Sequence, residues 1–209
     1  MRTPVNRYCM VSSVVRVLEF GAMDSIVPTV ETKRLRLRWI DENDLEQLFG
    51  IFSNEEVMRY WSSPPLKDRL AAQALLQEIH EGVQQRSFLK WGLALRADDE
   101  LIGTATLFHL EMNHKRAELG YVLGREHWGN GYIHEALPSL LDYAFYELHL
   151  HRLEADVDPR NARSIKTLER LGFRREGYLR ERWHVNGEIQ DALFYGLLLP
   201  EWKQSAASR

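Results

Sequence analysis

Cysteine is nearly absent from this sequence, whose 209 residues include only Cys9, close to the N-terminus. A disulfide framework within the chain is therefore excluded, because a disulfide needs two cysteines. Chains that depend on disulfides belong to oxidising compartments, so the scarcity of cysteine indicates a reducing one. We expect the protein to be cytoplasmic.

Long apolar runs and an excess of one charge are also missing. No apolar run approaches the roughly 20 residues that a membrane-spanning helix needs, so we expect no membrane partner. The net charge is −3, from 27 basic and 30 acidic residues, which gives no reason to expect nucleic-acid binding. The sequence has no internal repeat and no Gly/Ser-rich linker. With 44% hydrophobic residues, the chain instead fits one globular domain with its own core.

The two ends of the chain differ from its middle. Residues 1–30 begin with a basic stretch in which the first acidic residue is Glu19. An unbroken apolar segment and a small-residue cleavage site are missing, which argues against a secretory signal. We expect an N-terminal extension that is flexible or that precedes a working initiator at Met23, with an organellar transit peptide as the alternative. The domain itself is predicted over 33–203, and 204–209 is predicted to be a C-terminal tail.

Hydrophobic periodicity predicts strands and helices throughout this domain. Apolar residues at every second position indicate half-buried strands, and apolar residues three and four apart indicate amphipathic helices. Strands are predicted over 34–38, 88–96, 101–110, 116–124, 152–158, 173–182 and 188–199, and helices over 41–52, 54–60, 68–86, 132–148 and 161–171. Turn residues at 97–100 and at Asn186-Gly187 predict hairpins. This order of elements is typical of one α+β or α/β domain.

A glycine-bearing turn joins the predicted strand 116–124 to the predicted helix 132–148. Gly129 and Gly131 can adopt positive φ and let a ligand approach the backbone closely. The first amides of a helix lack internal partners and carry partial positive charge, so this junction is a candidate anion site. A Walker phosphate loop is excluded because its lysine and hydroxyl residue are missing, and a dinucleotide fingerprint would need glycine where His134 stands. A plain structural turn is the alternative.

Four motifs in register give the sequence a family resemblance. They are the loop Glu126–Gly131 with the following Tyr132 and Glu135, the segment Asn161-Ala162-Arg163-Ser164, the segment Leu171-Gly172-Phe173, and the hairpin Asn186-Gly187 with Asp191. With these motifs the chain resembles GNAT-family N-acetyltransferases of the ribosomal-protein-alanine type. Glu126 departs from the Gln or Arg that opens the family loop.

The resemblance implies an α+β fold in a single domain, with a central, mostly antiparallel mixed sheet, a splayed parallel strand pair and flanking helices. Strands 116–124 and 152–158 would form that pair, and helix 132–148 would cross between them. Acetyl-CoA would lie in the splay as co-substrate. The implied cofactor-binding residues are Val122, Leu123 and Gly124 along the pantetheine, Trp128, Gly129, Asn130, Gly131, Tyr132, Ile133 and His134 around the pyrophosphate, and Asn161 at the pantetheine.

The resemblance also implies a catalytic pair, Glu118 and Ser164. Transfer to an amine needs a base that removes a proton and an acid for the departing thiolate. Glu118 would be the base, and Ser164 would protonate or stabilise the thiolate. The structural alternatives are an exposed strand carboxylate for Glu118 and a first-turn helix residue for Ser164. Asn161 has an alternative as well, because asparagine at a helix start is a common N-cap.

Two positions depart from the family pattern. Leu168 stands where many members carry a tyrosine acid, and Trp183 stands where ribosomal-alanine acetyltransferases carry a glutamate. Glu181, two residues earlier, would share a strand face with Trp183 and is a candidate substitute. Trp61 and Trp183 are candidate acceptor-binding residues, because amphipathic rings suit an amine with an apolar body. Core packing is the alternative for each ring.

These inferences give a functional hypothesis, in which an enzyme moves an acetyl group from acetyl-CoA to a primary amine by direct attack in a ternary complex. The acceptor would be a protein N-terminus, such as that of a ribosomal protein, or a small amine. The alternatives are a catalytically weak CoA-binding regulatory module and a nucleotide-dependent oxidoreductase. The resemblance further implies a homodimer. No metal is expected, because the eight histidines form no zinc-ligand pattern.

Overall fold

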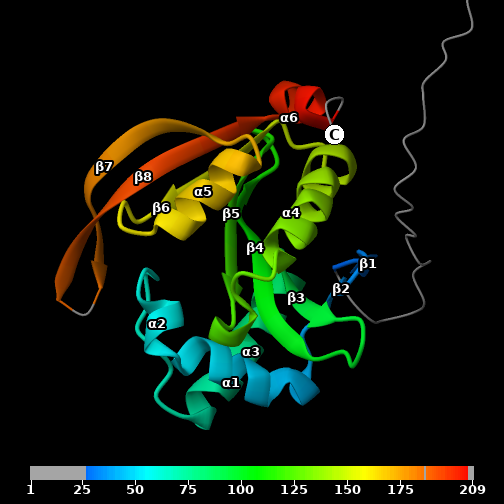
Figure 1. The fold of residues 1–209 in the computed structure, drawn as a ribbon, viewed down its shortest axis with the longest axis vertical. Coiled ribbons are helices and arrows are strands. Elements are labelled where there is room, and N and C mark those ends of the chain that lie inside the picture. The colour runs from blue at the N-terminus through cyan, green and yellow to red at the C-terminus, as the bar shows by residue number, and fades with distance from the viewer. Residues whose placement is uncertain (1–26, 186, 207–209) are drawn as a thin grey trace, which may run out of the picture.

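The computed structural model describes residues 27–185 and 187–206 of the chain (Figure 1). Residues 1–26 of the predicted N-terminal extension, with Cys9 and Met23, lie outside the described residues. Its last residues belong to the domain instead, because Val27 is buried in the core and Val30 begins β1. The first strand is β1 (Val30–Glu31), and the last helix is α6 (Leu199–Ala206).

One eight-stranded sheet forms the centre of the molecule, in the order β1-β2-β3-β4-β5-β6-β8-β7 (Figure 1). Its further strands are β2 (Leu35–Arg38), β3 (Phe88–Leu95), β4 (Leu101–Glu111), β5 (Arg116–Leu123), β6 (Arg152–Val157), β7 (Arg174–Val185) and β8 (Glu188–Leu198). All neighbouring strands run antiparallel except β5 and β6. The predicted α+β domain with a mixed, mostly antiparallel sheet is therefore confirmed.

The parallel strands β5 and β6 separate along their length. Their pairing joins residues 116–118 to residues 152–154 and stops there. From Leu119 to Leu123, the edge of β5 that faces β6 has no strand partner among the described residues. This is the predicted splay, and it leaves backbone groups of β5 available to a ligand.

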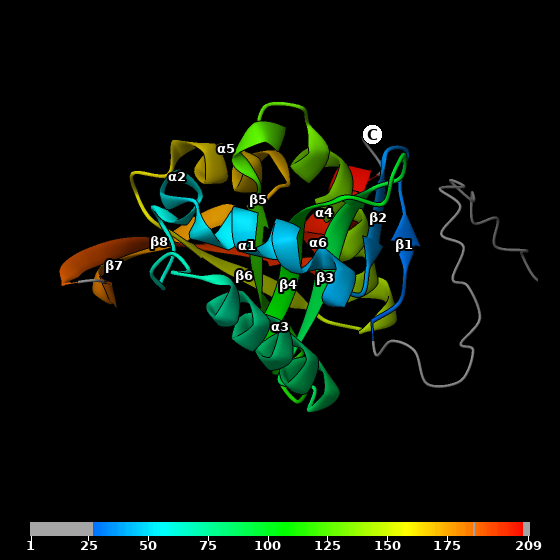
Figure 2. The same ribbon diagram turned by 90° about the horizontal axis from the view of Figure 1, so that it is seen from below.

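Helices cover both faces of the sheet (Figure 2). The helices α4 (Tyr132–Asp142), α5 (Ala162–Arg170) and α6 lie on one face, and α1 (Leu45–Ser53), α2 (Glu55–Met58) and α3 (Arg69–Gln84) lie on the other. Two clusters of buried apolar side chains match these layers. One joins α4 and α5 to the sheet, and the other joins α1 and α3 to β4 and β5. The splay is thus enclosed by helices from both sides.

The segment predicted as one helix over 132–148 has an irregular end. It consists of α4 followed by a π-helical turn, Tyr143–Glu147. There the N–H of Leu148 donates to the carbonyl of Tyr143, five residues back, at 3.0 Å. The wider turn ends the crossover and leads into β6.

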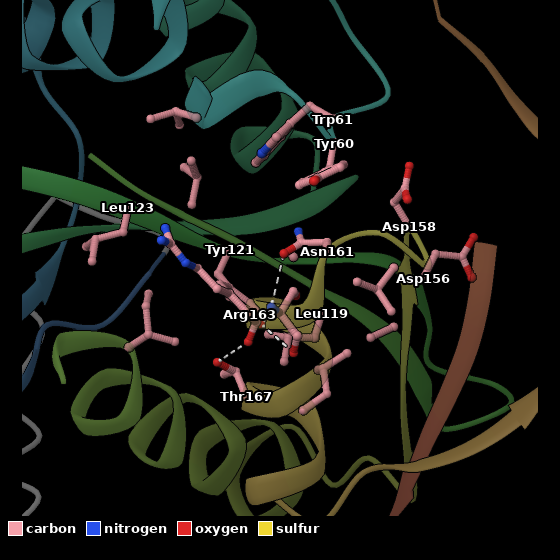
Figure 3. A pocket seen from close by; sticks show the side chains of 18 of the residues that line it. Tyr60, Trp61, Leu119, Tyr121, Leu123, Asp156, Asp158, Asn161, Arg163 and Thr167 are labelled. Carbon is pink, nitrogen blue, oxygen red and sulfur yellow. Dashed lines mark hydrogen bonds between the residues drawn. The ribbon is translucent and has the colours of Figure 1, made fainter. Parts of the chain in front are cut away.

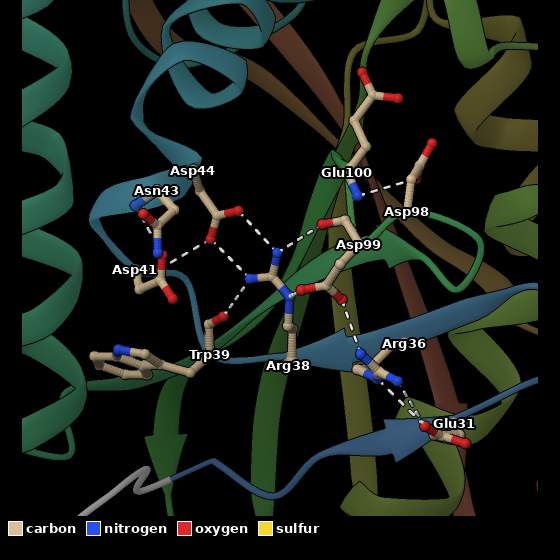
Figure 4. Close-up of polar contacts among 10 residues, drawn as sticks. All are labelled: Glu31, Arg36, Arg38, Trp39, Asp41, Asn43, Asp44, Asp98, Asp99 and Glu100. Carbon is tan, nitrogen blue, oxygen red and sulfur yellow. Dashed lines mark hydrogen bonds and ion pairs between the residues drawn. The ribbon is translucent and has the colours of Figure 1, made fainter.

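A buried ion pair fixes the start of α1 against the sheet (Figure 4). Arg38 on β2 donates to both carboxylate oxygens of Asp44, at 2.7 and 2.8 Å, and to the carbonyl of Asp99 at 2.9 Å. Asp44 in turn accepts from the N–H of Asp41 at 2.9 Å and completes a capping box. Asp44 raises the pKa of the Arg38 guanidinium. The network holds the α1–α2 segment, which carries one wall of the cleft described below.

Candidate active site

A cleft of about 1200 Å³ passes through the gap between β5 and β6. Side chains alternate along β5, so Glu118 and Val122 face the α1–α3 layer while Leu119 and Tyr121 face the α4–α5 layer. Residues of both sets line the cleft. The cleft therefore has walls on both faces of the sheet.

The loop before α4 lies at one end of the cleft. Gly129 and Gly131 have φ of +81° and +78°, and Gly131 is the residue that precedes the first turn of α4. This left-handed conformation favours glycine, because a Cβ crowds the backbone there. The first amides of α4, which have no partner within the helix, begin at this loop, so this end of the cleft is a candidate anion site.

A carboxylate clamps this loop to the edge of the sheet. Glu135 accepts from the hydroxyl of Thr32 at 2.7 Å, from the N–H of Arg34 at 2.6 Å and from Nε of Arg34 at 2.7 Å. Arg34 also donates to the carbonyl of Asn130 at 3.0 Å. Although desolvation acts to raise the pKa of Glu135, these hydrogen bonds outweigh it and lower that pKa. The sequence singled out Glu135 but not its partners, which are about a hundred residues away in the chain.

Positive charge gathers around the same end. The guanidinium groups of Arg125 and Arg163 lie 4.8 and 4.6 Å from the ring centroid of Trp128. Lys166 and Arg170 on α5 line the cleft as well. Several cations beside a helix N-terminus and two glycines with positive φ suit a ligand with several phosphate groups, such as coenzyme A. These cations were not among the residues predicted from the sequence.

Most of the predicted cofactor-binding residues line this cleft. They are Val122, Leu123, Trp128, Gly129, Gly131, Tyr132, Ile133, His134 and Asn161. Gly124 and Asn130 are not part of its wall. The N–H of Gly124 donates to the carbonyl of Ile102 at 2.8 Å, and the indole N–H of Trp128 donates to the carbonyl of Leu123 at 2.7 Å. The free edge of β5 therefore lies before Leu123 rather than after it.

Two hydroxyl groups meet beside the splay, one from β5 and one from α5. Tyr121 and Ser164 share a hydrogen bond of 2.7 Å between their hydroxyl oxygens, and both line the cleft. Figure 3 shows Tyr121 among the side chains of this cleft. Asn161 caps α5 by accepting from the N–H of Ser164 at 3.1 Å, as its N-cap alternative predicted. Burial raises the pKa of Tyr121 to about 12, so this phenol keeps its proton at neutral pH. Leu168 is buried in the core and supplies no hydroxyl.

Glu118 lies where the two parallel strands part. Its side chain is 10% exposed, and it bonds Nδ1 of His109 at 2.8 Å. Desolvation raises the pKa of Glu118; the bond to His109 acts against this shift and the charge of Asp156 adds to it. His109 has a φ of +49° where the β4–β5 register becomes irregular. A carboxylate with a raised pKa in a cleft is suited to accept a proton near neutral pH.

A bulge in β7 overturns one expectation. The register with β8 shifts between Leu179 and Trp183, and Glu181 lies in that stretch with a φ of +54°. The strict alternation of side chains is therefore broken, because a bulge inserts residues without cross-strand partners. Trp183 lines the cleft, whereas exposed Glu181 does not and is no substitute base.

The aromatic residues behave differently from one another. Trp61 lines the cleft next to Tyr60 and packs its ring edge against Phe52, with centroids 5.5 Å apart. Trp91, in contrast, is fully buried in the core. Trp61 and Trp183, the two predicted acceptor-binding residues, thus both line the cleft.

Among residues 27–185 and 187–206, no group of three or more His, Cys, Asp or Glu side chains could hold a metal ion. None of the described helices is both long and apolar enough to span a bilayer.

Together, an anion site at the start of α4 and a cleft between parting parallel strands define a class of protein, the acyl-CoA-dependent transferases. Comparison with known families gives the particular one. The family model described as acetyltransferase (GNAT) domain matches residues 34–174, and the chain belongs to this family. It is an acetyl-CoA-dependent N-acetyltransferase.

Relatives and solved structures agree with this assignment. An N-acetyltransferase of Bacillus licheniformis is 36% identical over 174 residues, covering 83% of this chain and 98% of the relative. The [ribosomal protein uS5]-alanine N-acetyltransferase of Escherichia coli is 32% identical over 187 residues, covering 85% and 95%. The crystal structure of spermidine N-acetyltransferase from Vibrio cholerae, in complex with CoA and spermine, has a TM-score of 0.72 and 25% identity, covering 81% of this chain and 98% of that one.

Proposed function

We propose that the enzyme transfers the acetyl group to a primary amine, of a protein N-terminus or of a small molecule, by direct attack in a ternary complex. The observation that carries this proposal is the passage of the cleft through the sheet. A donor held between α4 and α5 leaves the α1–α3 face open to the acceptor. Simultaneous binding brings the reacting groups together and makes an acyl-enzyme unnecessary.

The donor end fits acetyl-CoA, which supplies the acetyl group as a thioester. The amides at the start of α4 and the cations Arg125, Arg163, Lys166 and Arg170 would hold the phosphate groups. The unpaired edge of β5 would pair with the pantetheine arm as an added strand does. Asn161 would contact the same arm in addition to capping α5.

The two predicted catalytic residues lie on opposite sides of the splay. Glu118 faces the acceptor side and would take the proton from the attacking amine. Ser164, bonded to Tyr121, faces the donor side and would deliver a proton to the departing thiolate. Many family members carry a tyrosine acid at the position of Leu168. Here Tyr121 would supply the phenol hydroxyl that this position lacks.

The acceptors of two relatives indicate the chemical class of the acceptor. One acts on the alanine of a ribosomal protein and another on spermidine, as their names state. Both acceptors are amines. We infer an amine acceptor here too, in a cytoplasmic setting, with a homodimer as the expected assembly.

Calorimetric titration with acetyl-CoA, CoA, NADH and ATP tests the donor site, and thiol release over a panel of amines tests transfer. We expect binding selective for acetyl-CoA and CoA, and release that depends on the amine. Binding without release for any amine would favour the regulatory module. Tight NADH binding would instead favour an oxidoreductase.

Ser164→Ala is expected to lower kcat by about tenfold to a hundredfold while the affinity for acetyl-CoA stays near that of the wild type. The hydroxyl acts only on the leaving group, so its loss affects turnover rather than binding. Tyr121→Phe should lower kcat in the same direction, because it removes the partner of that hydroxyl. Steady-state kinetics with calorimetry measures both effects, and an unchanged kcat in Ser164→Ala would return Ser164 to a structural role.

A further inference from the structure

An acidic side chain in the acceptor half of the cleft has an oxygen without a partner. Asp156, on β6, lines the cleft with 8% of its side chain exposed, and its Oδ2 accepts from Nε of Arg182 at 3.1 Å. Its Oδ1 is buried and receives no hydrogen bond from any described residue. A buried carboxylate oxygen without a donor is unfavourable until a ligand supplies one.

A basic side chain in the same cleft has no ion-pair partner among the described residues. Lys90, on β3, is half-buried, and its Nζ lies 5.8 Å from the ring centroids of both Phe52 and Phe88. No carboxylate of the described residues comes within 4.0 Å of it, and exposed Glu78 is the acidic group that acts on it from α3. Burial lowers the pKa of Lys90 to about 8. An ammonium group among aromatic rings is stabilised by a bound anion.

The register of the sheet places these groups on one face. Phe88, Phe108 and Glu118 form a row across β3, β4 and β5. Lys90 is two residues after Phe88 on β3, so both side chains lie on the same face as this row. Asp156 is on the same face as Glu118, two residues beyond its last paired partner on β6, Glu154. Two strand spacings separate β3 from β5, a distance of about 10 Å.

Apolar side chains fill the space between the two charges. The ring of Phe108 lies over Gly120, where a Cβ would come within 3.0 Å of Phe108 Cε1. Leu75 and Ile79 from α3, with Trp61, line the opposite wall. The cleft therefore presents carboxylates, an apolar middle and an ammonium group in that order.

Two other charged groups that line the cleft, Arg160 and Asp191, already have partners. Arg160 pairs with Asp158 and with Glu188, at 2.6 Å in each case. Asp191 accepts from the N–H of Glu181 at 2.8 Å and from the hydroxyl of Tyr178. A ligand that enters between β3 and β6 thus meets two incompletely paired charges of opposite sign.

We propose that the acceptor is a dipolar primary amine, with a negatively charged group about 10 Å from the reacting nitrogen. This rests on the proposed function, because it describes the acceptor of that reaction. Glu118 and Asp156 receive the ammonium end, with an N–H donating to Oδ1 of Asp156, and Lys90 pairs with the distant anion. A free α-amino acid fits poorly, because its carboxylate lies beside two like charges. An ω-amino acid and a peptide N-terminus with a nearby acidic side chain share the required chemistry.

The test uses unbranched ω-amino acids from glycine to aminooctanoate, each beside its own amide, with thiol release as the readout. The quantity compared is kcat/KM for each amino acid divided by kcat/KM for its amide. For the wild type, we expect this ratio to be below one for glycine and about ten for aminooctanoate. Lys90→Gln should bring the aminooctanoate ratio to about one, and Asp156→Asn should raise the glycine ratio. Comparing ratios between variants cancels the different amine pKa values of acid and amide.

A second series separates the two sources of this chemistry. Short peptides that begin with alanine and carry Glu or Gln at the third position replace the ω-amino acids. If the wild type prefers Glu over Gln only in this peptide series, and Lys90→Gln abolishes that preference, the result supports the proposal with a peptide as the acceptor.

Glu154→Gln is the matched control, because Glu154 is on the same face of β6 but outside the cleft wall. Its ratios should equal those of the wild type, and calorimetric affinity for acetyl-CoA confirms that each variant is folded. In each series, the proposal requires that the wild type prefer the negatively charged acceptor and that Lys90→Gln abolish this preference. The proposal is overturned if neither series shows this result. Absence of thiol release with every amine rejects the proposed function instead, so the two failures are distinguishable.

Discussion

Gly131→Val is expected to weaken acetyl-CoA binding by about a hundredfold or more, because it displaces the amides that we propose hold the phosphate groups. Gly131 has a φ of +78° immediately before α4, a conformation that a β-branched residue rarely adopts. To relieve this strain the loop must shift, and the first amides of α4 shift with it. Losing two charge-assisted hydrogen bonds at about 1.5–3 kcal/mol each accounts for the expected loss. Calorimetric titration measures it.

Gly187→Val is the matched control for this variant. Gly187 has a φ of +82° in the β7–β8 turn, with no atom within 4 Å of an added Cβ. At Gly131 the nearest atom is Nη2 of Arg34, at 3.7 Å, so neither position is crowded. Both variants carry the same backbone strain, about 1–2 kcal/mol in unfolding free energy, but only Gly131 lines the cleft. Wild-type affinity in Gly131→Val would show that the loop does not bind the phosphate groups.

Glu118→Gln is expected to lower kcat by about 10²–10³-fold, because glutamine keeps the shape of the side chain but cannot accept the proton. The affinity for acetyl-CoA should not change, since Glu118 faces the acceptor side of the sheet. Glu154→Gln provides the comparison, because Glu154 is the cross-strand partner of Glu118 and is outside the cleft wall. Steady-state kinetics with a saturating amine measures kcat. A fall of equal size in both variants would indicate damage to the strands rather than loss of a base.

The same carboxylate predicts the acidic limb of the pH profile. Desolvation raises the pKa of Glu118 above the ordinary glutamate pKa of about 4.3. On acidification, kcat/KM should therefore begin to fall at a higher pH than an ordinary glutamate base would give. The hydrogen bond from His109 lowers that pKa, so His109→Asn, which keeps a donor, should leave the limb in place. His109→Gly removes the donor and should move the limb to higher pH. Both replacements tolerate the positive φ of His109, so backbone strain is matched. A limb that stays fixed in His109→Gly would show that another group sets it.

The donor end of the site was predictable because its determinants are local. Gly129 and Gly131 follow a strand and precede a helix, and the unpaired amides at a helix start favour an anion. The cap at Asn161 and the pairing of Val185 with Glu188 at the end of the β7–β8 hairpin likewise depend on residues a few positions apart. The roles of these residues in binding stay predictions, whereas the elements that carry them are confirmed.

Prediction failed where a local irregularity interrupted a simple period. The argument for Glu181 assumed strict alternation along its strand, and the bulge between Leu179 and Trp183 breaks it. The π-helical turn at 143–147 is a similar case, because its apolar spacing resembles that of an α-helix. Neither irregularity has a clear signal in composition or spacing.

The sequence by itself determined the family, the order of the strands and helices from β2 to β8, and the glycine-bearing turn before α4, because each depends on neighbouring residues or on motifs read in order. Only the tertiary structure decided which distant side chains meet. Tyr121 finds Ser164, Glu135 finds Thr32, and Asp156 comes to face Glu118 across the splay. The physical reason is that strand pairing and helix packing join segments far apart in the chain, and the pKa values and unpaired charges of the cleft arise only after those segments are buried together.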